Sequence, residues 1–162
     1  MRDFSQFLQI ITPAPKIKLL EVTSHADDLS EALAKYLVGV EGDLHLALYP
    51  GEHTLPEYDF VKSHAPKDYK SPFRALPREY AAVVMTDILH LHEFSERILK
   101  IAYTSLLNAS EIIIVQQKST MGVEEIEILL EKLDFRAGNS IDIFDEYHVV
   151  VAKKMHMWGN GL

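Results

Sequence analysis

One stretch near the middle of the chain carries the strongest signal of the fold class: Tyr80-Ala81-Ala82-Val83-Val84-Met85-Thr86-Asp87-Ile88-Leu89-His90. Its first half is an apolar run without polar alternation, which is typical of a strand covered on both faces of a parallel sheet. Polar residues follow directly. In open α/β sheets the loops at the carboxyl ends of the strands carry the ligand site. The stretch therefore predicts an inner strand that ends at a functional edge.

Other short apolar runs on both sides of this stretch predict further strands. They cover residues 17–22, 44–49, 58–61 and 112–115. Apolar residues at helical spacing lie between the runs and predict helices over residues 26–38, from Phe94 to about Asn108, and around residues 126–133. Strands that alternate with helices of this length predict right-handed βαβ units and a parallel sheet.

The two ends of the chain depart from the alternation. Phe4, Phe7, Leu8 and Ile11 predict a short helix before Pro13, so residues 1–15 are expected to form a helical extension. Ile141 and Ile143 are followed by the apolar run 148–152 with no helix between them, which predicts an antiparallel terminal hairpin. The apolar tail 155–162 is expected to pack on the body of the domain or on a second copy, so a homodimer stays an alternative.

Composition limits the function classes. The 162 residues, 48% hydrophobic and 25% charged, predict one globular domain over residues 1–162. A net charge of −8 argues against a nucleic-acid partner, because phosphate binding depends on Lys and Arg. The absence of cysteine excludes disulfides and thiolate metal sites. The sequence shows neither a signal peptide nor a membrane span, so we expect no membrane partner and a cytoplasmic location.

The order of the elements resembles that of the class I, Rossmann-like methyltransferases that depend on S-adenosylmethionine (SAM). In that family seven strands occur, and the last is antiparallel and inserted beside the fifth. Residues 18–22 resemble the first strand with its terminal acid, 80–90 the fourth-strand motif, 107–115 the entry to the fifth strand, and 129–135 with 145–154 the closing elements. The resemblance spans residues 16–154. It implies a three-layer αβα, doubly wound, mostly parallel sheet of seven strands.

The resemblance also implies a SAM site along the carboxyl edge of the sheet. It assigns Glu21, Thr23, Ser24, His25 and Asp27 to the methionine part, Tyr49 and Glu52 to the ribose, Ser63 and His64 to the adenine edge, and Thr86 to the reacting centre. Asp87, His90 and His92 lie at that centre as catalytic candidates, and either histidine is a candidate base near neutral pH. No motif identifies the methyl acceptor.

Several positions depart from the family pattern. Thr23, His25 and Asp27 occupy the three glycine positions of the family's acid-x-Gly-x-Gly-x-Gly loop, and Tyr49 stands where a carboxylate usually grips the ribose. The alternative is therefore an inactive methyltransferase fold that serves as a binding or assembly module. Asp27 and Asp28 at a helix start would repel a pyrophosphate, which argues against NAD.

Histidines at the strand ends support a third hypothesis, a metal-dependent hydrolase. His25, Asp28 and His64 are its candidate ligands, and Ser24-His25-Ala26-Asp27-Asp28 resembles the His-Pro-Asp-Asp motif of zinc-dependent N-deacetylases. The proline of that motif is absent here, and no pair of histidines has a recognised ligand spacing. The simpler interpretation is that these histidines lie in polar loops.

Overall fold

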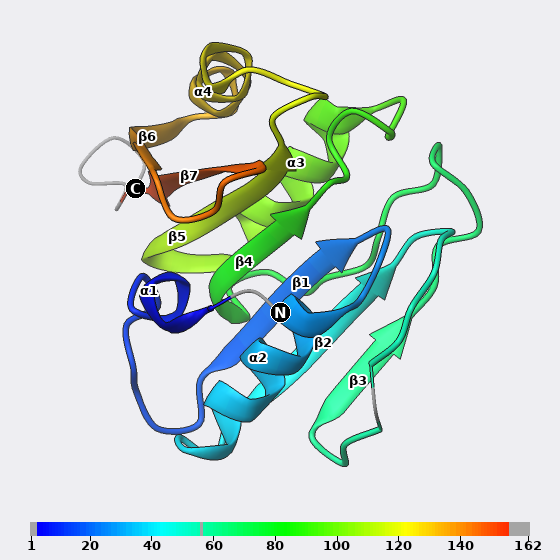
Figure 1. Cartoon of the computed structure of the whole chain (residues 1–162), viewed down its shortest axis with the longest axis vertical. Helices are drawn as coiled ribbons and strands as arrows, with labels where there is room; N and C mark the ends of the chain where they lie inside the picture. Colours follow the sequence, from blue (N-terminus) through cyan, green and yellow to red (C-terminus); the bar gives the residue numbers. More distant parts are fainter. Residues whose placement is uncertain (1–2, 56, 156–162) are drawn as a thin grey trace.

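The structure is a computed structural model that describes residues 3–55 and 57–155 (Figure 1). Its strands are β1 (Lys18–Thr23), β2 (Asp43–Leu48), β3 (Val61–His64), β4 (Tyr80–Thr86), β5 (Leu106–Gln117), β6 (Phe135–Ile141) and β7 (Tyr147–Lys154). Its helices are α1 (Ser5–Leu8), α2 (Asp28–Val38), α3 (Ser95–Ser105) and α4 (Val123–Lys132). The described part of the chain contains no helix that is long and apolar enough to cross a membrane.

The strands form one sheet in the order β3-β2-β1-β4-β5-β7-β6. The first five strands run parallel, whereas β7 pairs antiparallel with both β5 and β6. Strand β7 is thus inserted between β5 and β6. This confirms the predicted mostly parallel sheet of seven strands with an antiparallel terminal hairpin.

Each face of the sheet has its own apolar core. Phe7 of α1 and Leu33 of α2 pack against one face, and Ile98 of α3 and Leu130 of α4 pack against the other. Side chains alternate between the two cores along every inner strand, because successive residues of a strand point to opposite faces. The arrangement confirms the predicted three-layer αβα architecture (Figure 1).

Several element bounds differ from the prediction. The N-terminal helix covers only Ser5–Leu8, and two i→i−3 turn bonds, from Ile10 to Phe7 and from Ile11 to Leu8, follow it; Ile11 is still buried. Helix α3 ends at Ser105 and β5 begins at Leu106 without a loop, so the predicted helix end near Asn108 is wrong. Residue Ile143 lies in the turn after β6 rather than in the strand. Pairing with the apolar strand β7, not its own pattern, makes residues 135–141 a strand.

Two connections between parallel strands contain no helix among their described residues. The described residues of the segment 49–60 join β2 to β3 as coil, and the segment 65–79 joins β3 to β4 in the same way. Parallel neighbours are usually connected through a helix. Here Tyr69 and Phe73 of the segment 65–79 pack against the core on the α3 side instead. The third strand lies at Val61–His64, later than the predicted 58–61.

Candidate functional site

The carboxyl ends of β1, β2 and β4 meet at one edge of the sheet. Thr23, the last residue of β1, lies opposite Leu48 of β2 and opposite Thr86 of β4. The loops that follow these strands therefore start side by side, as the sequence predicted. Most of the predicted site residues lie in these loops or directly before them.

Glu21 is buried between β1, β4 and α2. Its side chain has no solvent exposure, and its two carboxylate oxygens accept hydrogen bonds from Ser30 Oγ at 2.5 Å and from Thr86 Oγ1 at 2.9 Å. A carboxylate with two hydroxyl donors tolerates burial, because its charge is partly compensated. The two bonds of Glu21 therefore connect α2 to β1 and β4 beneath the edge.

His25 lies between two carboxylates at the edge. Its Nε2 is 3.5 Å from Asp87 Oδ2 and 3.7 Å from Asp27 Oδ2, and its Nδ1 is 3.2 Å from Ser24 Oγ. The His25 side chain is 27% exposed, so solvent reaches the cluster. The structure thus brings together four predicted residues, and the group combines two acids with a histidine.

Asp87 is held in an unusual conformation. Its φ is 50°, in the left-handed region, where Asp and Asn are more common than most other residues. The carboxylate accepts hydrogen bonds from the backbone N–H of Gln117 at 2.7 Å and from Gln117 Nε2 at 3.1 Å. These bonds tie β4 to the end of β5 and fix the carboxylate that faces His25.

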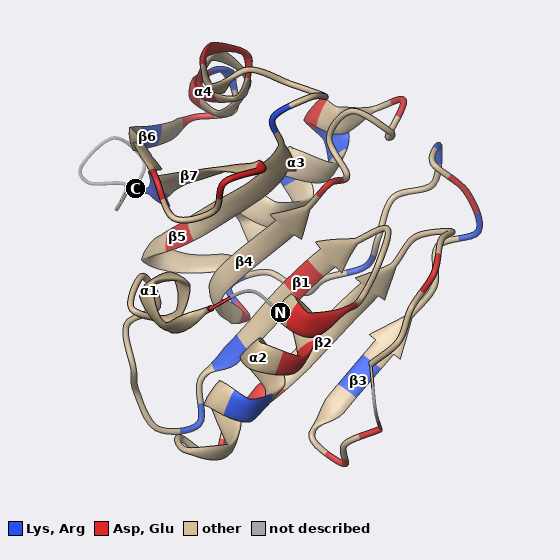
Figure 2. Cartoon of the chain, viewed as in Figure 1, with Lys and Arg blue, Asp and Glu red and all other residues tan. Residues whose placement is uncertain are grey.

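Backbone N–H groups in the loop between β1 and α2 donate hydrogen bonds to nearby side chains. Thr23 Oγ1 accepts from the backbone of His25 at 3.0 Å, and His53 Nδ1 accepts from the backbone of Ala26 at 2.9 Å. The N–H of Leu29 is 3.1 Å from an oxygen of Asp27 and equally close to one of Asp28. The side chains of Thr23 and Asp27, at two positions where the family pattern has glycine, therefore cap this loop, and Figure 2 shows the acidic start of α2.

The loop after β2 lies directly on the loop after β1. A Cβ atom on Gly51 would be 1.9 Å from the carbonyl oxygen of Ser24, so only glycine fits there. The backbone N–H of Thr54 donates to the carbonyl of Ala26 at 2.8 Å. The other ring nitrogen of His53, Nε2, lies 2.9 Å from the carbonyl of Tyr49. The two loops are thereby joined at several points.

An aromatic cluster fills the edge on the α3 side. Tyr49 is fully buried, stacks on Tyr69 with ring centroids 5.6 Å apart, and meets the ring of His92 edge-on at 5.4 Å. Its hydroxyl donates to the carbonyl of Ser71 at 2.6 Å, and burial raises the pKa of this tyrosine. Tyr69 donates in turn to the carbonyl of Pro50. These contacts hold the segment 65–79 over the ends of the strands.

The remaining predicted residues are dispersed around this cluster. His64 Nε2 accepts from the backbone of Arg74 at 3.0 Å, and burial lowers the pKa of this histidine. His92 uses both ring nitrogens, Nδ1 for the N–H of Phe94 at 2.9 Å and Nε2 for the carbonyl of Ser71 at 3.0 Å. Glu52 is exposed, and Ser63 lines a cavity of about 480 Å³ that Ala26 and His53 also line.

His90 is exposed at the same edge. Its Nδ1 lies 2.6 Å from the side-chain nitrogen of Gln116, at the end of β5. Gln116, Tyr69 and His53 were not among the residues predicted for the site. Gln116 carried a detectable signal, since it is a polar residue directly after the apolar run that ends at Val115. Tyr69 carried none, because its segment has no periodic pattern.

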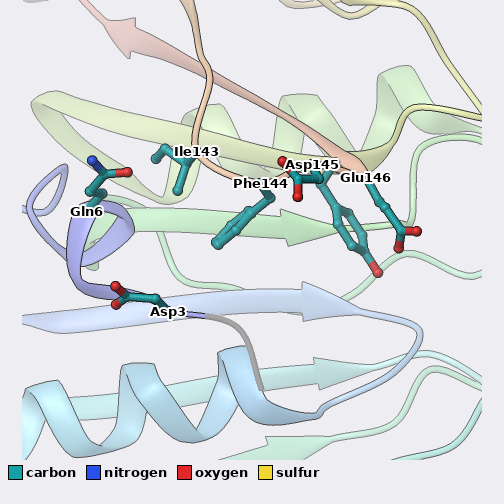
Figure 3. A pocket seen from close by; sticks show the side chains of 7 residues that line it. Asp3, Gln6, Ile143, Phe144, Asp145 and Glu146 are labelled. Carbon is teal, nitrogen blue, oxygen red and sulfur yellow. The ribbon is translucent and has the colours of Figure 1, made fainter.

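Metal ligation finds no support in the geometry. Among residues 3–55 and 57–155, no group of three or more His, Cys, Asp or Glu side chains is arranged to hold a metal ion. The set His25, Asp28 and His64 is thus not assembled. Carboxylates also line a cavity of about 470 Å³ between α1 and the turn before β7, but Figure 3 shows Asp3 and Glu146 on opposite sides of it.

Comparison with known proteins gives structural matches only. No family model matches the chain, and no curated protein matches it. A SAM-dependent methyltransferase from Aquifex aeolicus matches with a TM-score of 0.76 and 13% identity, over 95% of this chain and 90% of that one. Phosphoethanolamine N-methyltransferase 2 of Haemonchus contortus, in complex with SAM, matches with a TM-score of 0.68 and 9% identity, over 93% of this chain. The chain spans only 51% of the length of that enzyme.

A third match comes from a complex. It is the candidate methyltransferase bound to the Trm112 methyltransferase activator of Haloferax volcanii, with a TM-score of 0.68 and 8% identity, over 96% of this chain and 89% of that one. At such identities a likeness establishes the fold and not the activity. The protein therefore has the fold of the class I SAM-dependent methyltransferases, as its strand order also shows.

Proposed function

We propose that the protein binds SAM at the carboxyl edge of β1, β2 and β4 and acts as a SAM-dependent methyltransferase. The observation that carries the proposal is the strand order β3-β2-β1-β4-β5-β7-β6, with an antiparallel β7, in a chain that matches SAM-dependent methyltransferases over nearly its whole length. In open α/β sheets this edge is where ligands bind.

The side chains at the edge fit the chemical groups of the cofactor. The carboxylates of Asp27 and Asp87 suit the ammonium group of its amino-acid part, since charge-assisted hydrogen bonds are the strong ones. The ring of Tyr49 offers a stacking face for the nucleoside once Tyr69 leaves it. When bound, SAM supplies an activated methyl group. The chain itself orients the methyl acceptor. The exposed His90 takes up the proton that the acceptor gives up.

Binding requires the segment 65–79 to move away from the edge. Tyr49 is fully buried beneath this segment, and hydrogen bonds from Tyr49 and His92 to the carbonyl of Ser71 hold it in place. Each such bond contributes roughly 0.5–1.5 kcal/mol. The apparent affinity is the intrinsic affinity multiplied by the fraction of molecules that are open. Because the closed form is stabilised by these bonds, we expect weak binding.

Isothermal titration with SAM and with S-adenosylhomocysteine tests the proposal. A ligand at about 100 times its dissociation constant adds about 2.7 kcal/mol, or several degrees of melting temperature, to a chain of this size. Asp27→Asn should weaken binding, whereas Asp134→Asn, an exposed acid before β6, should not. No heat and no thermal shift at millimolar SAM would overturn the proposal.

One observation favours a second candidate, a binding or assembly module that has lost the cofactor. The backbone of Gly51 is packed on Ser24, and His53 bonds to the N–H of Ala26, so the cofactor loop is closed by the protein's own backbone as well as by side chains. A negative titration together with a stable complex with another protein would support this candidate. The structural relative in a complex with an activator makes a protein partner the one to seek.

We further propose a cytoplasmic location, which the lack of cysteine supports.

A homodimer through the apolar tail is the remaining proposal, and residues 156–162 lie outside the described part of the chain. Sedimentation of the full chain beside a chain that ends at Lys154 tests it. A dimer that persists without the tail would contradict it.

A further inference from the structure

A cavity of about 480 Å³ lies where the connection from β2 to β3 contains no helix among its described residues. A helix usually connects two parallel strands and covers the sheet between them. Here the segment 49–60 crosses as coil, and Pro50 and Gly51 at its start disfavour a helix. Figure 1 shows this segment beside β3, at the end of the sheet away from α4. The cavity occupies a place that a connecting helix would otherwise cover.

Most of the side chains that line the cavity are apolar. They all belong to the core on the α2 side of the sheet or to the loop before α2: Ala26, Leu46, Leu48, Leu55, Tyr58 and Val61. Leu46 is buried, whereas Leu48 and Val61 are partly exposed. Pockets for small molecules usually measure about 300–1,000 Å³ and combine apolar walls with a few polar groups. The cavity therefore has the size and the walls of a small-molecule site.

The charged residues of the cavity are both acidic. Glu57 and Asp59 line it with exposed carboxylates, and Figure 2 shows acidic residues on the segment that leads into β3. Neither carboxylate forms an ion pair or a hydrogen bond with another described residue. His53 has both ring nitrogens engaged, with the N–H of Ala26 and with the carbonyl of Tyr49. No described lysine or arginine lines the cavity, so its charge is complementary to a cation.

The cavity lies on the opposite face of the sheet from the aromatic cluster. Tyr49 and Tyr69 pack with the core on the α3 side, whereas the leucines of the cavity pack with the core on the α2 side. Among the residues predicted to bind SAM, only Ser63 lines the cavity. Ala26 and His53 form the boundary with the loop after β1. A ligand in the cavity would thus lie next to the proposed cofactor edge without occupying it.

We propose that this cavity binds a small amphipathic amine. The apolar body of the ligand contacts the leucines and Tyr58, and its ammonium or guanidinium group meets the carboxylates of Glu57 and Asp59. Burial of the apolar body supplies most of the affinity, because ion pairs with exposed carboxylates contribute little. The two carboxylates instead select a positive charge over a neutral or negative one. This proposal does not depend on the proposed function.

Isothermal titration with three indole compounds tests the proposal. Tryptamine carries an ammonium group, indole-3-ethanol is neutral and indole-3-propionate is negative, while the ring is the same. Tryptamine should bind about 2- to 30-fold more tightly than indole-3-ethanol, as expected for two exposed ion pairs, and the propionate should bind most weakly. Glu57→Gln combined with Asp59→Asn should remove this preference. Glu124→Gln combined with Glu131→Gln, two exposed acids of α4, is the matched control and should keep it.

Two further measurements locate the bound amine. Ser63→Phe adds a ring at an exposed position of β3 that lines the cavity, so it should abolish binding of tryptamine while the melting curve shows a folded protein. In the wild-type protein, tryptamine should shift the methyl NMR signals of Leu48 and Val61. The signals of Val123 and Leu129 on α4 should stay in place.

Several outcomes would overturn the proposal. These are no heat with tryptamine at millimolar concentration, equal affinity for the three compounds, or unchanged affinity in the Glu57 and Asp59 variant. Methyl shifts outside the cavity would overturn it as well. Displacement of tryptamine by SAM would make the cavity part of the cofactor site and would also contradict the proposal. A failed SAM titration would instead overturn the proposed function and leave the amine site standing.

Discussion

The ring of Tyr49 lies against the ring of Tyr69, with centroids 5.6 Å and planes 17° apart. Tyr49 comes directly after β2, whereas Tyr69 belongs to the coil segment that joins β3 to β4. This stacked pair covers the edge at which the fold family is expected to bind its cofactor. Under the proposed function, SAM binding requires this pair to separate.

Tyr69→Ala should increase the affinity for SAM. Removing one ring of a stacked pair destabilises the closed form relative to the open form by about 0.5–1.5 kcal/mol. This corresponds to about a 2- to 10-fold larger open fraction. The dissociation constant should fall by the same factor, because the apparent affinity scales with that fraction. Isothermal titration measures it. Tyr58→Ala, a tyrosine paired with Phe60, is the control and should leave the constant unchanged.

Gly51→Ala should destabilise the protein, while Gly39→Ala should not. A methyl group at position 51 would lie 1.9 Å from the Ser24 carbonyl, and relieving that overlap costs about 1–3 kcal/mol. Gly39 has a φ of −66°, and its nearest neighbour for a new methyl group is 3.5 Å away. Alanine there should be neutral or stabilising by up to about 1 kcal/mol. Urea unfolding compares the two, and equal midpoints would contradict the close contact of the loops.

Asp87→Ala should cost more stability than Asp87→Asn. Asparagine tolerates a positive φ and keeps an oxygen for the N–H of Gln117, so a loss below about 1 kcal/mol is expected. Alanine loses that acceptor, and its conformation is also less favourable, so about 2–3 kcal/mol should be lost. The free energy of unfolding in urea gives both values. Similar losses for the two variants would mean that the carboxylate charge is the dominant factor.

Stability should rise as the pH increases towards 6.5, the ordinary histidine pKa. Burial lowers the pKa of both His45 and His64 in the folded state. The unfolded chain therefore binds more protons in this range, and the free energy of unfolding increases with pH until the unfolded histidines have also lost theirs. Protonation would also remove the acceptors for Tyr80 and for the backbone of Arg74.

Urea unfolding between pH 5 and pH 7.5 measures this slope. His45→Gln and His64→Gln should each flatten it, because each removes one group with a lowered pKa. The exposed His90→Gln serves as the reference variant. A slope that remains unchanged in both variants would show that other groups cause it.

The fold was largely predictable because its signals are local. The apolar runs around residues 80–85 and 112–115 became β4 and β5, and the run 148–152 lies within the antiparallel strand β7. Residues 135–141 were not predictable as a strand, since their partner β7 and not their own sequence makes them one. The coil conformation of the described residues in the segments 49–60 and 65–79 was equally hidden, because it depends on packing against distant residues.

The site was predictable as a place but not as an arrangement. Chain order placed His25 and Asp87 at the same edge, because parallel strands end together, and the structure confirms that they meet. Chain order could not show that Gly51 packs on Ser24, or that the side chain of Gln116 contacts His90. Those contacts join residues 27 and 26 positions apart in the chain.

Local patterns in the chain were enough to predict the layers, the parallel strands and the edge that carries the polar loops, because burial and periodicity act over a few neighbouring residues. Tertiary packing, in contrast, covers this edge with Tyr49 and Tyr69 and brings the side chain of Gln116 to Nδ1 of His90. Such contacts depend on how loops from different strands pack together, and no local pattern encodes that packing.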